Sequence, residues 1–387
     1  MTNFSLSSVH RSVVLVVLAS SVLLGCGPRD GRKELAKGQA AYEAGQFEKA
    51  VRFFEKSLAC APDRVDAILY LARTKLALGE LETAKDLSAR ASALSDDVDV
   101  KMFSAQVAWH AKDYAAAAQG FQELANDAHL APEVRAEAWA CLGVVEMSCE
   151  NSHRARIAFL RALRLNFKDA SARYHLGFLY RDAFGYHEAA LEQFQIFVRL
   201  EADATPRVQK VQRVVIPALQ KQIAVEAANR PGVDRRDSAA SAAAITRATA
   251  AESGKRTEQA RKEYEVALKA DPLSARAALG LARCWQKTVP SKKKGGEANP
   301  QLRALEYYQL ACSLQPSRLA TFLSAGDLAA RQGQYARAVE IYSRAVAANP
   351  TSFDALDGLI RALRRQGKPR IAQDYQLYRE SIPVKRR

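Results

Sequence analysis

The strongest constraint on the fold of this chain is a spacing of small, aromatic and proline residues that recurs along it. Gly38–Pro62 reads GQAAYEAGQFEKAVRFFEKSLACAP, and Gly326–Pro350 reads GDLAARQGQYARAVEIYSRAVAANP. At the same intervals, both segments hold two glycines, an aromatic residue, an alanine, a second aromatic residue and a closing proline. A pattern that recurs in this way is the signature of a repeat protein, in which each unit packs only on its neighbours.

The pattern resembles the tetratricopeptide repeat, a helix–turn–helix unit of about 34 residues. The resemblance implies that small Gly38 and Ala50 let the two helices of a repeat, helix A and helix B, approach closely. It also implies that Phe54 fills the space toward the next repeat. Pro62 ends helix B, because proline cannot continue a helix beyond its first turn. We therefore expect an all-α fold, a superhelical solenoid of tetratricopeptide repeats.

Further copies of the pattern bring the expected number of repeats to about eight to nine. The additional copies begin near Val65, Val98, Ala136, Ala170 and Phe353, and two more contain Ala260 and Leu281. No separate catalytic domain fits into a chain that the repeats account for so fully.

Two interruptions break the period. Val208–Ala228 predicts a helix that Pro217 kinks or divides. Ser238–Ala251 is rich in alanine and low in bulky side chains, so we expect it to be a poor former of a core and place a junction here. Pro290–Glu297 carries charges and paired glycines, which predict a mobile surface loop between the two helices of the seventh repeat.

The repeats, their interruptions and the N-terminal sequence predict six segments along the chain. They are a signal peptide at 1–25, a tether at 26–30, a first repeat block at 31–204, an irregular helical junction at 205–240, a second repeat block at 241–383 with an insertion at 290–300, and a basic tail at 384–387.

The N-terminus is apolar from Val13 to Leu24. A helix that crosses a bilayer needs about 20 apolar residues, so this run fits the core of a secretory signal peptide better than a membrane span. The run ends in a segment that resembles the bacterial lipobox. Its residues are Leu23, Leu24, Gly25 and Cys26.

The lipobox resemblance implies that the Cys26 thiol accepts a lipid with palmitate-type acyl chains and that Cys26 becomes the new N-terminus. Two or more acyl chains anchor a protein stably to a membrane. Gly27 differs from the aspartate that retains such lipoproteins in the inner membrane. The resemblance therefore places the protein at the periplasmic face of the outer membrane, if the cell has two membranes. The alternative is an uncleaved apolar segment with a buried cysteine.

Charge is unevenly distributed. Residues 1–200 carry 24 basic and 24 acidic residues, so residues 201–387 carry the whole net charge of +15. Of the six cysteines, five remain once Cys26 is acylated, and none forms a CxxC pair. A disulfide framework is not indicated, although one oxidised pair stays possible in an exported protein.

No motif predicts catalysis, a metal site or a cofactor. His187–Leu191 begins like a zinc-protease motif but lacks the second histidine, and the six histidines are scattered. No phosphate loop of the Walker type or dinucleotide fingerprint is present.

The family resemblance implies that helix A lines the concave surface through repeat positions 2, 5, 9, 12 and 13. In the first block these positions give an apolar, aromatic groove with a few charges, suited to a partner helix or an extended peptide. Its residues are Tyr42, Arg73, Leu76, Met102, Trp109, Met147, Tyr174, Phe178 and Arg181. The alternative is that some of them fill the core between helices.

In the second block the same positions give a basic groove, set against Asp327, Asp354 and Asp357. Its residues are Arg276, Arg283, Lys287, Arg331, Arg361, Arg364 and Arg365. Arginine matches carboxylates with two parallel hydrogen bonds, which predicts an acidic segment or a C-terminal carboxylate as ligand. The alternative is a solvated helix face.

These features predict an exported, lipid-anchored scaffold that binds other proteins in the bacterial cell envelope, without catalysis. The oligomeric state stays open. Nucleic acid is not expected as a ligand, because the protein is exported and lacks a platform of aromatic and basic residues. The alternative function is binding of anionic cell-wall polymer or lipid headgroups through the basic C-terminal half. Lipoproteins of this kind resemble pilotins of pilus secretins, accessories of outer-membrane assembly and activators of cell-wall synthases.

Overall fold

A computed structural model of the protein describes residues 31–201, 205–230, 232–288 and 299–383. Within these ranges the chain is helical and contains no strand, which confirms the predicted all-α fold. The predicted signal peptide, lipobox, tether and basic tail, with most of the predicted insertion, lie outside the described residues. The chain divides into two compact units between Leu179 and Tyr180. This division falls before the predicted junction, and the predicted segment boundaries stay a prediction.

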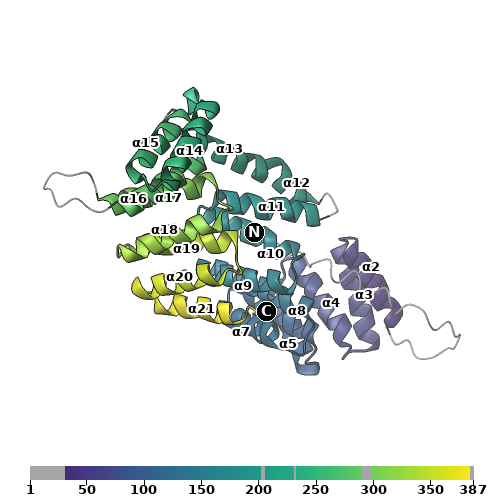
Figure 1. Cartoon of the computed structure of the whole chain (residues 1–387). Helices are drawn as coiled ribbons and strands as arrows, with labels where there is room; N and C mark the ends of the chain where they lie inside the picture. The colour runs from purple at the N-terminus through teal and green to yellow at the C-terminus, as the bar shows by residue number, and fades with distance from the viewer. Residues whose placement is uncertain (1–30, 202–204, 231, 289–298, 384–387) are drawn as a thin grey trace. The chain divides into compact units, whose positions relative to one another are not determined.

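Unit 1 is built from helix pairs that follow one another along the chain (Figure 1). The helices are α2 (Arg32–Glu43), α3 (Phe47–Cys60), α4 (Val65–Ala77), α5 (Leu81–Leu94), α6 (Val98–His110), α7 (Tyr114–Asn126), α8 (Pro132–Ser148), α9 (Ser152–Leu165) and α10 (Ala170–Asp182), which crosses the unit boundary. Each even-numbered helix up to α8 packs against the odd-numbered helix that follows it, so the pairs are the A and B helices of successive repeats.

Unit 2 continues with helix pairs after an irregular start. Its helices are α11 (His187–Leu200), α12 (Pro206–Lys210), η2 (Val211–Val215), α13 (Ile216–Ala228), η3 (Val233–Arg235), α14 (Ser238–Ser253), α15 (Thr257–Ala270), α16 (Ala275–Lys287), α17 (Pro300–Leu314), α18 (Leu319–Arg331), α19 (Tyr335–Ala348), α20 (Phe353–Arg365) and α21 (Pro369–Glu380). From α14 onward the helices again pack as A and B pairs.

In the core, most B helices set a buried aromatic side chain against small residues of neighbouring A helices; α5, which has no aromatic residue, is an exception. A methyl group on Gly143 would lie 2.5 Å from a ring carbon of Phe159, and one on Gly38 would lie 2.5 Å from Phe54. Both rings are fully buried. Close-packed interiors leave no room for an added carbon at such distances, so glycine is required where these helices meet.

The turns between A and B helices place one residue in the left-handed region of φ. Glycine takes this position at several turns, such as Gly79 with φ 83° and Gly333 with φ 72°. Lys112, Glu150 and Lys255 take it at other turns, with φ of 58° to 63°. A residue with a β-carbon is strained there by about 1–2 kcal/mol. The turns therefore keep the same backbone geometry even where a residue other than glycine takes the left-handed position.

The irregular segment at the start of unit 2 confirms one prediction made from the sequence and contradicts another. Its helix is divided as predicted, because the π-helical turn η2 separates α12 from α13 just before Pro217. The interpretation of Ser238–Ala251 as a poor core former is wrong. This stretch is most of α14, which packs closely on α15 and buries Ala244, Ala248 and Ala251. Alanine side chains allow this close approach.

Candidate functional site

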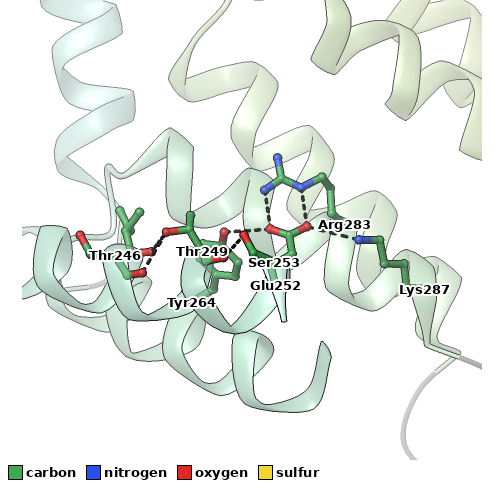
Figure 2. Close-up of polar contacts among 8 residues, drawn as sticks. Thr246, Thr249, Glu252, Ser253, Tyr264, Arg283 and Lys287 are labelled. Carbon is green, nitrogen blue, oxygen red and sulfur yellow. Dashed lines mark hydrogen bonds and ion pairs between the residues drawn. The ribbon is translucent and has the colours of Figure 1, made fainter. Parts of the chain in front are cut away.

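Four side chains from three helices meet where α14 ends (Figure 2). The Glu252 carboxylate accepts hydrogen bonds from Arg283 on α16, from Nη2 at 2.8 Å and from Nε at 3.1 Å. Lys287, one turn further along α16, donates to the same carboxylate at 3.3 Å. The hydroxyl of Tyr264, the core aromatic residue of α15, donates to it at 3.0 Å. One carboxylate therefore joins two consecutive A helices and the B helix between them.

The electrostatics of this cluster favour the charged forms of its ion pair. Burial alone raises the pKa of Glu252, but the hydrogen bonds and charge of Arg283, with Tyr264 and Lys287, bring that pKa below its usual value. The hydrogen bonds that Arg283 donates to Glu252 raise the pKa of Arg283 in turn. Burial, followed by the charge of Glu252, raises the pKa of Tyr264 to about 12. At neutral pH the cluster therefore holds a carboxylate, two cations and a neutral phenol.

This arrangement shows that two cations of the predicted basic groove are already paired within the fold. Arg283 and Lys287 both belong to that prediction, and both are paired with Glu252. The predicted groove set only aspartates against these cations, and Glu252 was not among them. Counting twelve residues back from Tyr264 would have found it, because this position belongs to the expected inner face of helix A.

A related contact occurs within the repeat formed by α18 and α19. The Tyr342 hydroxyl donates to Asp327 Oδ1 at 2.5 Å. Burial and the Asp327 hydrogen bond raise the pKa of Tyr342, while Arg361 acts against this rise through its charge and a hydrogen bond. Asp357 pairs instead with Arg379 on α21. Two of the acidic residues that opposed the predicted basic groove are therefore engaged within the fold.

Four of the predicted cations remain exposed on α18 and α20, two A helices that are in contact. They are Arg331, Arg361, Arg364 and Arg365, which we call the arginine face. None of them forms an ion pair within the described ranges. The last three lie on one side of α20, since residues three and four apart are neighbours on a helix. Arg276 is also exposed, at the start of α16.

The groove residues predicted for the first repeat block differ widely in exposure. Arg73 and Met102 are buried, with exposed fractions of 8% and 7%. The others are half-buried: Tyr42, Leu76, Trp109, Met147, Tyr174, Phe178 and Arg181. Trp109 Nε1 donates to the Ser148 hydroxyl at 3.1 Å, which links α6 to α8. The burial of Arg73 and Met102 agrees with the alternative that some of these residues fill the core, and the groove itself stays a prediction.

Glu137, on α8 of unit 1, is a functional candidate that the sequence analysis missed. Burial raises the pKa of this carboxyl to about 7, and the charges of Asp169 and Asp99 add to the rise, while Arg73 lowers it. Near neutral pH Glu137 is therefore divided between its charged and neutral forms. Such a group at the beginning of an A helix has no distinctive sequence signal, because its pKa depends on its surroundings.

The described residues contain no group of three or more histidine, cysteine, aspartate or glutamate side chains placed to hold a metal ion. Their five cysteines are free thiols. In the same part of the chain, every helix is too short or too polar to cross a membrane.

Sequence profiles identify the repeats. A profile described as tetratricopeptide repeat matches residues 41–106, and a second profile of the same description matches residues 323–375. Both matched segments are therefore tetratricopeptide repeats. The first match lies in unit 1 and the second lies in unit 2, so both units contain the repeat. No curated protein is detectably similar to the chain in sequence.

Solved structures with a similar fold include other helical repeat proteins. PilF of Pseudomonas aeruginosa is 20% identical, with a TM-score of 0.41 over 52% of this chain and 93% of that one. YrrB, described as a tetratricopeptide-repeat protein with an unusual peptide-binding site, is 16% identical, with a TM-score of 0.34 over 48% of this chain and 93% of that one. At such TM-scores the likeness says nothing about what this chain binds.

The position of Glu137 predicts how stability depends on pH. The unfolded chain releases this proton near pH 4.5 and the folded chain near pH 7, so the stabilising contribution of the protonated carboxyl is complete below pH 4.5 and is lost as the pH rises through 7. Relative to the Glu137→Gln variant, the wild type should lose up to about 3 kcal/mol of unfolding free energy over this range.

Urea denaturation of both proteins across this pH range measures the difference. Glu133→Gln, an exposed position on the same helix, is the matched control and should follow the wild type. Parallel curves for the wild type and Glu137→Gln would contradict the assignment.

Proposed function

We propose that this protein is a scaffold of the bacterial cell envelope, exported and lipid-anchored at Cys26, that binds an acidic segment of a partner protein through the arginine face. Tetratricopeptide repeats bind peptide or protein partners and are typically non-catalytic. The observation that carries the proposal is the set of four exposed arginines without an ion-pair partner among the described residues.

The contrast with the neighbouring repeats supports an acidic ligand. Arg283 and Lys287 belong to the same predicted groove, but Glu252 already occupies them. The guanidinium groups of the arginine face have no such internal carboxylate. Planar, bidentate recognition makes arginine the residue best suited to carboxylates at an interface. A partner with several acidic side chains would therefore bind at α18 and α20 in preference to α16.

The proposed location in the cell envelope is based on the N-terminal sequence. The segment Leu23–Cys26 resembles a lipobox, and the apolar run before it has the length of a signal-peptide core. A lipid anchor would hold the repeats close to a membrane, where partner proteins of an envelope assembly are concentrated. We propose the outer membrane as the destination, because Gly27 differs from the aspartate that retains such lipoproteins in the inner membrane.

Reversing the charge of the arginine face tests the binding proposal. The variant Arg361→Glu, Arg364→Glu and Arg365→Glu should reduce capture of a defined protein partner from solubilised membranes about tenfold or more, because attraction becomes repulsion at three adjacent positions. The matched control is Lys255→Glu, Lys262→Glu and Lys269→Glu, which changes the net charge equally at exposed sites outside the arginine face.

Loss of capture in the first variant and not in the control is the expected result. If both variants retain the partner, the arginine face is not the binding surface. If the first variant instead loses only salt-sensitive binding to anionic vesicles or cell-wall sacculi, the alternative ligand, an anionic polymer or lipid headgroup, is correct.

The lipid anchor has its own test. Cys26→Ser should leave the protein outside the membrane fraction, since the thiol that accepts the lipid is gone. Fractionation and mass spectrometry of the N-terminus measure this, with Cys60→Ser as the control because that exposed thiol lies on α3. A Cys26→Ser protein that stays with the membrane at full length would contradict lipidation.

A further inference from the structure

Unit 2 contains a pocket of about 310 Å³ that α11, α18 and α19 line together. α11 contributes its first two turns, α18 its start with the turn before it, and α19 its last two turns. Binding sites for small molecules occupy about 300–1,000 Å³ and combine an apolar lining with a few polar groups that orient the ligand. The lining residues differ from those of the arginine face and of the Glu252 cluster.

The floor of the pocket is apolar and aromatic. Phe322 is 1% exposed and Tyr186 is 7% exposed, and Pro316 with alanines of α11 and α19 completes the apolar lining. The guanidinium carbon of Arg344, on α19, lies 5.8 Å from the centroid of the Tyr186 ring. Such a contact attracts a guanidinium to the face of the ring. It therefore holds the Arg344 side chain at the pocket, between α19 and the start of α11.

Three charged side chains line the pocket, and all three lack an ion-pair partner. Glu188 and Glu192 stand one turn apart on α11, where they are neighbours on the helix surface. Across residues 31–201, 205–230, 232–288 and 299–383, neither carboxylate side chain forms an ion pair or a hydrogen bond, and Arg344 pairs with no carboxylate. The pocket thus gathers charges of both signs that the fold itself does not pair.

This combination of charges indicates the chemistry of a ligand. Like charges at the spacing of Glu188 and Glu192 repel one another, so ammonium groups bound there would relieve the repulsion. The Arg344 guanidinium suits a carboxylate, which it can bind through two parallel hydrogen bonds. Because the acidic side chains outnumber the basic one by one, a ligand with two cationic groups and one carboxylate matches all three. The apolar floor suits an aliphatic chain between them.

We propose that this pocket binds a free diamino acid of the lysine type. Its carboxylate pairs with Arg344, its two ammonium groups pair with Glu188 and Glu192, and its aliphatic chain lies on Phe322 and Tyr186. The inference goes beyond the proposed scaffold function, because it gives unit 2 a small-molecule ligand. Such a ligand would join α11 to α18 and α19, which are far apart in the sequence, and so stabilise the contact between them.

A series of probes tests each charge of the ligand by calorimetric titration of the full chain. L-lysine carries all three charged groups, and three analogues each lack one: 6-aminohexanoate lacks the α-ammonium, norleucine lacks the side-chain ammonium, and cadaverine lacks the carboxylate. L-lysine should bind tightest. Each analogue should bind about tenfold more weakly or worse, because each loses one ion pair with charge-assisted hydrogen bonds.

Variants assign each pairing to a side chain. Arg344→Met should weaken binding of L-lysine about tenfold and leave cadaverine unaffected, since cadaverine has no carboxylate to lose a partner. Glu188→Gln combined with Glu192→Gln should weaken both ligands. The matched control is Glu340→Gln, an exposed position on α19 outside the pocket, which should behave as the wild type. The glutamate variants keep the proposal testable if Arg344→Met does not fold.

Equal affinities for L-lysine and norleucine, an equal effect of Arg344→Met on L-lysine and cadaverine, or no binding of L-lysine at millimolar concentration would overturn the proposal. Nα-acetyl-lysine that binds as tightly as L-lysine would also overturn it, and would indicate a C-terminal lysine of a partner protein instead. These titrations contain no partner protein and change no residue of the arginine face. Their failure would therefore leave the scaffold function standing, and failure of the arginine-face test would leave lysine binding unaffected.

Discussion

The structure depends on the contact between the buried aromatic side chains of the B helices, which α5 alone among the B helices of unit 1 lacks, and the small residues of the A helices beside them. Tyr342 shows it most fully. A methyl group on Gly326, in its own repeat, would lie 2.6 Å from the ring, and one on Gly358, in the next repeat, would lie 2.3 Å from it. The ring is thus enclosed by two consecutive A helices, and it fixes their separation. Because the A helices carry the candidate binding residues, this packing also determines which side chains can meet.

The same packing explains how equal repeat positions acquire different chemistry. In α15 and α19 of unit 2 the core aromatic residue is a tyrosine, and its hydroxyl donates to a carboxylate on the preceding A helix, as Tyr264 does to Glu252 and Tyr342 does to Asp327. In unit 1 the corresponding residue is Phe54, which brings no hydroxyl, and Tyr42 replaces the carboxylate. Arg283 is therefore paired within the fold, whereas Arg73 is buried between rings. The net charge of a segment does not reveal this difference, since pairing depends on which repeat positions carry the acids.

Much of the fold could be predicted from the sequence, because the repeat fixes helix type, helix order and the buried positions together. Gly38, Ala50 and Phe54 are buried as the pattern requires. The expectation for Ser238–Ala251 failed for a physical reason. Alanine lacks the bulk that marks a core in sequence, yet it lets α14 approach α15 closely. The site was less predictable. The sequence identified Arg283 and Lys287 but not the Glu252 carboxylate between them, and the raised pKa of Glu137 arises from burial that no local pattern records.

A double-mutant cycle at the junction of the last two repeats tests the central claim most directly. The variants are Gly358→Ala, Tyr342→Leu and their combination, and urea denaturation gives the free energy of unfolding of each. If the ring fixes the distance between consecutive A helices, the smaller leucine should relieve the clash with Ala at 358, and the coupling between the two changes should be about 1 kcal/mol or more. Additive effects, with no coupling, would contradict the account.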